Sequence, residues 1–188
     1  DRECTFSTLR KELERLKKMK QAPWGFLFAG HADSGHADGT KTLGFTTNGE
    51  LAPLGSSEKD ELVQLLGRHA KGKDGALELV FLSGCESLEL GKAIKQQNKA
   101  LRVVCWETRV PDAAGYVFSR GFFESLGSQD KQKGYDYEAA FKAASVALEN
   151  KHTRRPMNGM NEVPYFVIGD PDGDPAVTPV PAGVPRLL

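Results

Sequence analysis

The stretch ALELVFLSGCESLELGKAIKQQNKALRVVCW, residues 76–106, decides the fold class of this chain. It opens with an apolar run at 76–82, which is typical of a strand buried on both faces, and passes through a small polar turn at 83–87. A helix is predicted over 88–97, and a second apolar run follows at 101–106. A strand, a helix and another strand in this order form the unit from which parallel sheets are built. The stretch therefore predicts an α/β protein with a mostly parallel sheet.

The same alternation continues on both sides of this stretch. Pro23 ends an upstream helical pattern, and Asn48-Gly49 between apolar residues predicts a hairpin. A segment with four prolines between Pro175 and Pro185 follows the last predicted strand. The further predicted elements are a helix over 6–20, a strand over 24–29, a hairpin over 42–54, a helix capped by Ser56 or Ser57 that runs to about His69, a helix capped by Asp112 that runs through Leu126, a helix over 137–150, and a last strand over 163–168. We expect an N-terminal helix in 1–22, the α/β domain in 23–170 and a Pro-rich tail in 171–188.

Composition narrows the range of partners. Hydrophobic residues make up 39% of the 188 residues and charged residues 27%, which is typical of a globular protein. Lys plus Arg equals Asp plus Glu at 25 each, so bulk charge favours neither nucleic acid nor an anionic membrane as a partner. No apolar run reaches the roughly 20 residues that span a bilayer, and the first 20 residues are too charged for a signal peptide. Three cysteines, an odd and low number, fit a reducing compartment, so we expect a cytoplasmic protein.

Two reactive side chains follow predicted strands. His31 lies two residues after the strand 24–29, and Cys85 lies three residues after the strand 76–82. Ligands of open α/β sheets bind at the carboxyl ends of the strands, and an imidazole can activate a thiol as a nucleophile. Gly30 and Gly84 allow sharp turns there, and backbone N–H groups at such turns can stabilise an oxyanion. On position alone, a buried structural cysteine and a solvated histidine remain the simpler interpretation.

The ordered set of motifs resembles the CHAT domain, a caspase-like family of cysteine peptidases often fused to TPR repeats. The resemblance rests on VFLSGCES, LRVVCW, VPDAAGYVFSRGFFESL, EAAFKAASVAL and VPYFVIGDP, which follow one another in the family's order between residues 24 and 170. It implies a three-layer sandwich with a mostly parallel central sheet and helices on both faces. It also implies a protein or peptide substrate, flanking regulatory or repeat domains, and no cofactor. The family assigns the catalytic dyad to the positions of His31 and Cys85.

Two departures from the family pattern bear on the site. Ala32 stands where the family commonly has glycine after the histidine, although its N–H, like the backbone at Gly84, remains available for an oxyanion. The segment after Trp106 is two residues longer than in the family. The residue after this tryptophan lines the first specificity pocket of caspase-like enzymes, and here it is Glu107. Glu107, together with Asp33, predicts cleavage after Arg or Lys, because a carboxylate pairs with a basic side chain. Such a preference would make the basic loops candidates for self-cleavage.

Two other interpretations stay open. The chain can be a catalytically inactive CHAT-like interaction module in which the fold is kept without the activity. The doubled His-Ala-Asp of residues 31–38 contains His31 and His36, which could instead serve a metal-dependent hydrolase, although a distant ligand set is not evident. We therefore predict no metal site.

Overall fold

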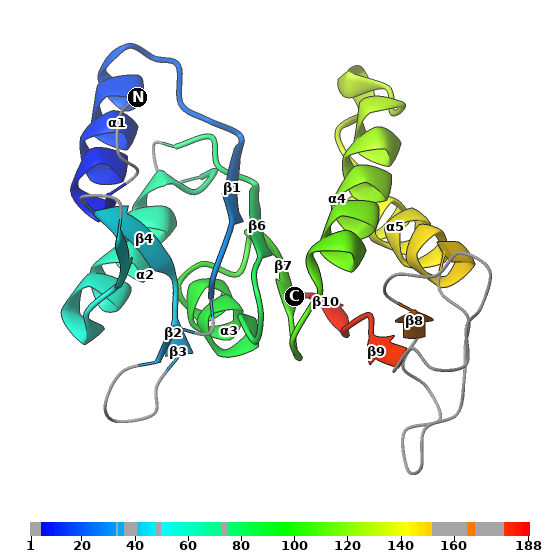
Figure 1. Ribbon diagram of the computed structural model, residues 1–188. Helices are drawn as coiled ribbons and strands as arrows, with labels where there is room; N and C mark the ends of the chain where they lie inside the picture. Colours follow the sequence, from blue (N-terminus) through cyan, green and yellow to red (C-terminus); the bar gives the residue numbers. More distant parts are fainter. Residues whose placement is uncertain are drawn as a thin grey trace. The chain divides into compact units, whose positions relative to one another are not determined.

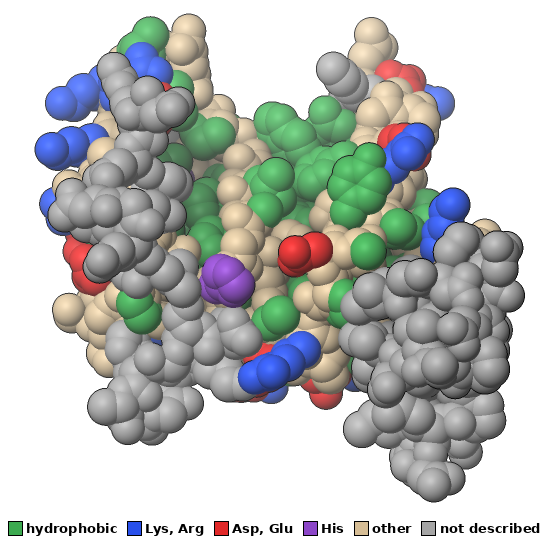
Figure 2. Space-filling view, viewed as in Figure 1, with side chains coloured by type: hydrophobic (Ala, Val, Ile, Leu, Met, Phe, Trp, Pro, Cys, Tyr) green, Lys and Arg blue, Asp and Glu red, His purple; other side chains and the backbone are tan. Residues whose placement is uncertain are grey.

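The computed structural model describes residues 5–32, 34–35, 41–47, 50–72, 75–151, 165–167 and 179–188. Its contacts divide the chain into two compact units. The first comprises Asp1–Trp106 with Leu188, and the second comprises Glu107–Leu187. No helix in the described residues is long and apolar enough to cross a membrane. On the face shown in Figure 2, Lys and Arg side chains are spread over several elements rather than gathered in one patch.

Three parallel strands form the centre of the first unit (Figure 1). They are β1 (Gly25–Ala29), β6 (Leu79–Ser83) and β7 (Arg102–Trp106), and the sheet has the order β1-β6-β7-β10. The pairing of β1 with β6 runs from Gly25 opposite Leu79 to Ala29 opposite Ser83. Both predicted apolar runs are therefore neighbouring strands, and the predicted mostly parallel α/β sheet is confirmed.

The helices of the first unit cover a continuous core. They are α1 (Phe6–Lys18), α2 (Ser56–His69) and α3 (Leu88–Gln97). Side chains alternate across a strand, so every second residue of β6 and β7 faces the same side. Val80, Leu82, Val103 and Cys105 belong to the core cluster that also holds Leu62 of α2 and Ile94 of α3. The helix predicted over 88–97 is thus confirmed residue for residue.

A hairpin packs beside this core. It consists of β4 (Gly44–Thr47) and β5 (Glu50–Pro53), paired antiparallel with Thr47 opposite Glu50. This register leaves only positions 48 and 49 between the strands, which confirms the hairpin predicted from Asn48-Gly49. Two short strands that were not predicted, β2 (Ser34–Gly35) and β3 (Lys41–Thr42), pair before it.

Two packed helices dominate the second unit. They are α4 (Asp112–Gly127) and α5 (Tyr137–Lys151), with a short 3₁₀ helix, η1 (Lys131–Lys133), between them. The rings of Phe118 and Phe141 meet edge to face with centroids 5.4 Å apart. Gly121 allows the close approach, because a Cβ there would lie 3.1 Å from Cα of Ala144. Both helices were predicted to within a residue or so of their observed ends, but the residue that caps α4 is Pro111 and not Asp112, which is the first residue of the helix.

The C-terminal region corrects two expectations. The strand β8 (Tyr165–Val167), predicted as the last one, is followed by β9 (Pro179–Pro181) and β10 (Pro185–Leu187). The segment 171–188 was expected to be a Pro-rich tail, but β9 pairs antiparallel with β8. Proline lacks a backbone donor and is tolerated at strand ends and edges, which explains how these strands escaped prediction.

The predicted cap of α2 is wrong as well. The residue that caps this helix is Gly55, whose N–H donates to the Glu58 carboxylate at 2.9 Å, and not Ser56 or Ser57.

Candidate active site

The register of β1 and β6 places His31 and Cys85 at equivalent positions. Ala29 lies opposite Ser83 in the parallel pairing, so His31 and Cys85 each follow the last paired residue of their strand by two positions. The N–H of Gly30 donates to the carbonyl of Ser83 at 3.1 Å and carries the pairing one step beyond the strands. His31 is exposed and Cys85 is partly exposed. The fold therefore brings together the two segments that carry the predicted dyad.

The two turns are in close contact through their backbones. A Cβ built on Gly84 would lie 2.6 Å from Cβ of Ala32 and 2.7 Å from the carbonyl oxygen of Gly30. Both separations are far below van der Waals contact, so only glycine fits at position 84. Ala32 itself is buried and belongs to the core cluster. Its methyl group fills the space beside Gly84, which accounts for alanine at a position where the resemblance leads one to expect glycine.

The hairpin fixes the backbone of His31. The carbonyl of His31 accepts a hydrogen bond of 2.7 Å from the N–H of Gly44, the first residue of β4. Leu43, the residue before β4, is held in turn by the residue after β5, because its carbonyl accepts a hydrogen bond of 2.9 Å from the N–H of Leu54. The imidazole therefore extends from a backbone that is held on one side by β4 and on the other by the edge of the sheet.

A buried serine supports the turn that carries Cys85. The hydroxyl of Ser87 donates to the carbonyl of Gly84 at 2.9 Å and accepts from the N–H of Trp106 at 3.0 Å. Ser87 is 2% exposed, so both bonds are shielded from water. They connect the turn after β6 to the end of β7. Ser87 is also the residue that precedes α3, and its carbonyl accepts from the N–H of Gly91.

The residue after Cys85 has an unusual backbone conformation. Glu86 has φ of 51°, in the left-handed region that non-glycine residues seldom adopt. The conformation costs on the order of 1–2 kcal/mol and persists only where the surroundings impose it. Glu86 lies between the tightly packed Gly84 and Ser87, whose hydroxyl makes two buried hydrogen bonds. The helix α3 begins at Leu88, so its positive N-terminal dipole lies three residues beyond Cys85.

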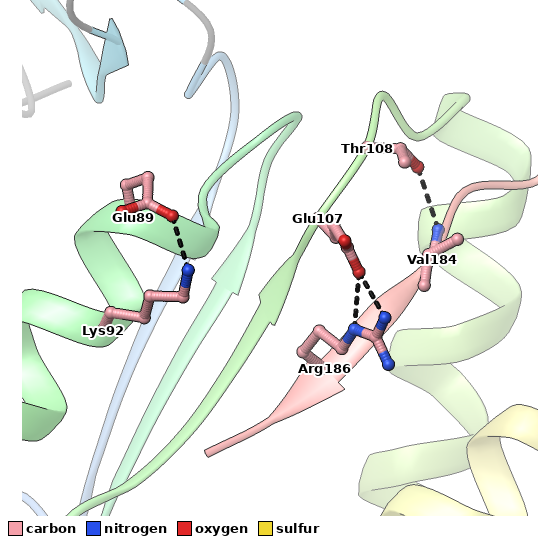
Figure 3. Close-up of polar contacts among 6 residues, drawn as sticks. All are labelled: Glu89, Lys92, Glu107, Thr108, Val184 and Arg186. Carbon is pink, nitrogen blue, oxygen red and sulfur yellow. Dashed lines mark hydrogen bonds and ion pairs between the residues drawn. The ribbon is translucent and has the colours of Figure 1, made fainter.

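Glu107 pairs with an arginine of its own chain. The Nε of Arg186 donates to Oε2 of Glu107 at 2.6 Å, as Figure 3 shows. Both side chains remain half exposed, Arg186 at 52% and Glu107 at 41%. The carboxylate thus has the position and charge to bind a guanidinium group. Asp33, His36 and Asp38 lie outside the described residues.

The shifted pKa values of the described residues lie away from these two turns. Burial lowers the pKa of His69 and of Lys95. The carboxylates of Glu12 and Glu124 raise the pKa of Arg15 and Arg120, respectively, through hydrogen bonds on the surface. Within the described ranges, no three His, Cys, Asp or Glu side chains are grouped so that they could hold a metal ion.

Two residues of this region were not predicted from the sequence. Ser87 was recognised only as part of the turn, because its bond to Trp106 joins positions 19 residues apart. Arg186 gave no signal at all, since it lies 79 residues from Glu107 in a Pro-rich segment. No family model matches the chain, and no curated protein matches it either. The residues and their geometry therefore carry the functional interpretation.

Proposed function

We propose that this chain is a caspase-like cysteine endopeptidase domain of the CHAT type, in which Cys85 is the nucleophile and His31 the general base. The observation that carries the proposal is the equivalent placement of the two residues beyond the paired ends of β1 and β6. The close packing of Gly84 on Gly30 and Ala32 supports it, because it keeps the two turns in one place. The α/β fold with its mostly parallel sheet is consistent with a caspase-like sandwich that has helices on both faces.

The proposed reaction is a two-step hydrolysis of a peptide bond. The Sγ of Cys85 gives its proton to His31 and attacks the scissile carbonyl carbon. The C–N bond then breaks, and the imidazolium of His31 returns the proton to the leaving amine. Water, deprotonated by His31, attacks the thioester, which releases the acid and regenerates the thiol. Backbone N–H groups around Gly84–Cys85 and His31–Ala32 would hold the oxyanion.

The proposed substrate is a protein or peptide with Arg or Lys before the scissile bond. Glu107 follows Trp106 directly in the chain, and Trp106 is bonded to Ser87 of the turn that carries Cys85. The ion pair with Arg186 supports this preference, since it demonstrates that a guanidinium can reach the Glu107 carboxylate. Asp33 would add to the preference. The same specificity would allow the enzyme to cut its own basic loops in a reducing, cytoplasmic environment.

Covalent labelling tests the dyad and its preference together. Peptidyl acyloxymethyl ketones with Arg, Lys or Asp next to the reactive carbonyl are incubated with the protein, and the modified residue is located by mass spectrometry. We expect modification at Cys85, fastest with Arg and Lys. Cys85→Ala abolishes it, and His31→Ala slows it by a factor on the order of 10²–10⁴, the usual contribution of a general base. Cys105→Ala, which removes a buried thiol of the core, leaves the labelling in place.

Two results would contradict the proposal. Equal labelling of the Cys85→Ala variant would exclude Cys85 as the nucleophile, and faster reaction with the Asp reagent would exclude the basic preference. No labelling of a folded protein by any reagent would favour the second candidate, a non-catalytic interaction module. The occupied carboxylate of Glu107 is the observation that favours this module.

A further inference from the structure

The segment Val184–Arg186 contacts Glu107 and Thr108 in the manner of an extended peptide ligand. The N–H of Glu107 donates to the carbonyl of Val184 at 2.9 Å, and the N–H of Val184 donates to Oγ1 of Thr108 at 3.0 Å. The Arg186 side chain adds the ion pair with Glu107 (Figure 3). All of these residues belong to the second unit.

This combination of contacts is the one by which proteins recognise extended peptides. Main-chain hydrogen bonds supply affinity that does not depend on sequence, and a side-chain contact supplies specificity. Glu107 accepts from the guanidinium and donates its own N–H to the same segment, so one residue makes both kinds of contact. A substrate with a basic side chain would need the same carboxylate.

We propose that the side chain of Arg186 is an internal ligand of the Glu107 carboxylate, which the basic side chain of an incoming peptide must displace while β10 keeps its place in the sheet. The inference rests on the proposed function, because it assigns the internal arginine to the position of the substrate's basic residue. A tethered side chain competes at a high effective concentration, so the carboxylate is closed to weak ligands until the guanidinium of Arg186 leaves it. The chain therefore restrains its own binding of basic peptides.

The exposure of the pair makes displacement feasible. Ion pairs between half-exposed side chains contribute little to folding, because water screens them in the folded state. Substitution of Arg186 therefore changes the occupancy of the Glu107 carboxylate more than it changes the fold. A buried ion pair could not be exchanged in this way without exposing an unpaired charge.

Equilibrium binding in the full chain tests the proposal without any chemistry. The background carries Cys85→Ala, and the probe is a fluorescent pentapeptide with the sequence of residues 184–188, VPRLL, followed by anisotropy. Arg186→Glu places a like charge opposite Glu107 and weakens the internal ligand. We expect the pentapeptide to bind this variant at least about threefold tighter than the background protein, a change of the size that exposed ion pairs allow. The same peptide with glutamate in place of its arginine should gain nothing.

A charge exchange separates ligand recognition from folding. Glu107→Lys combined with Arg186→Glu keeps an ion pair inside the chain, so the fold is retained, and circular dichroism verifies this in every variant. The preference between the two peptides should reverse, with the glutamate peptide now the tighter ligand. Arg120→Gln is the matched control, because it breaks another exposed ion pair of the second unit, Arg120 with Glu124 at 2.7 Å, and should leave peptide binding unchanged.

Equal affinity of the pentapeptide for Arg186→Glu and for the background protein overturns the internal ligand, as does a charge exchange that leaves the preference unreversed. Labelling of Cys85 by a ketone reagent with an uncharged side chain reports the dyad independently of Glu107. If the pentapeptide test fails while Cys85 is still labelled, only the internal ligand is excluded. If Cys85 is not labelled, the proposed peptidase is excluded.

Discussion

Ser87 connects three parts of the candidate site with one hydroxyl group. It donates to the carbonyl of Gly84, accepts from the N–H of Trp106 and precedes the first turn of α3. The N–H of Trp106 and the carbonyl of Gly84 depend on this hydroxyl in a place that water does not reach, since Ser87 is 2% exposed. Loss of a buried partner costs more than the net value of the bond itself, because the remaining polar groups stay desolvated.

We predict that Ser87→Ala lowers the free energy of unfolding by about 1–3 kcal/mol, the cost of leaving buried polar groups without their partner. Urea denaturation followed by circular dichroism measures the change. Ser128→Ala serves as the control, because the Ser128 hydroxyl donates to the carbonyl of Ser125 on an exposed surface and its loss should cost less than about 0.5 kcal/mol. Similar losses in the two variants would contradict a supporting role for Ser87.

At the scale of elements, α1 packs against α2 around a buried histidine. His69, the last residue of α2, is 3% exposed, and its Nε2 lies 3.8 Å from a carboxylate oxygen of Glu14 in α1. Burial lowers the pKa of His69 below its ordinary value of 6.5, and Glu14 offsets part of this effect. Lys17 and Arg68 lower the pKa further through charge repulsion. Burial therefore favours the neutral imidazole, against the attraction of Glu14.

This pKa shift predicts that stability falls in acid. The unfolded chain binds a proton at His69 near pH 6.5, whereas the folded chain resists it, so the contribution of neutral His69 is present above pH 6.5 and is lost as the pH falls from there through the lower pKa of the folded state. We expect the unfolding free energy of the wild type to drop more between pH 7.5 and 5.5 than that of His69→Leu. Both proteins share every other titrating group. The difference between them in how far the urea midpoint shifts with pH therefore measures the contribution of His69. Parallel pH profiles would contradict the prediction.

The elements that the sequence predicted are those whose signal is local. The strand, turn and helix of residues 76–97 are encoded by neighbouring residues; the structure reproduces the helix and places the strand at Leu79–Ser83, which begins three residues later than predicted and ends one residue later. The strand β10 is held by β7, which lies far away in the chain, and the prolines of β9 and β10 resemble a tail when the sequence is considered alone. Long-range pairing is also the reason that the bond from Ser87 to Trp106 escaped prediction. His31 and Cys85 were placed correctly at strand ends because that placement needs only the strand boundaries.

At the scale of the whole chain, Leu188 joins the first unit although the residues before it belong to the second. Its N–H donates to the carbonyl of Val103 at 2.9 Å, and its carbonyl accepts from the N–H of Val103 at 3.3 Å. Its side chain packs against the core cluster. A single residue therefore adds both backbone pairing and apolar contact to the sheet.

We predict that Leu188→Ala lowers the unfolding free energy by about 1–2 kcal/mol, less than for a fully buried leucine because Leu188 is only partly buried. The backbone pairing with Val103 remains, so the loss reports the side chain alone. Leu27→Ala is the control, since Leu27 of β1 is 55% exposed and its truncation should cost less than about 0.5 kcal/mol. Urea denaturation compares the two, and a larger loss for Leu27→Ala would contradict the assignment.

The parallel register of β1 and β6 makes the candidate site independent of how much chain separates its halves. His31 and Cys85 lie at the same edge of the sheet because their strands pair, whatever the length of the 53 residues between them. The free energy of closing a loop grows only slowly with its length, so the connection between Thr47 of β4 and Glu50 of β5 could be lengthened at little cost while Gly44 keeps its bond to His31. The site is in this sense modular: a foreign segment inserted between Thr47 and Glu50 would leave the turns that carry the imidazole and the thiol in place.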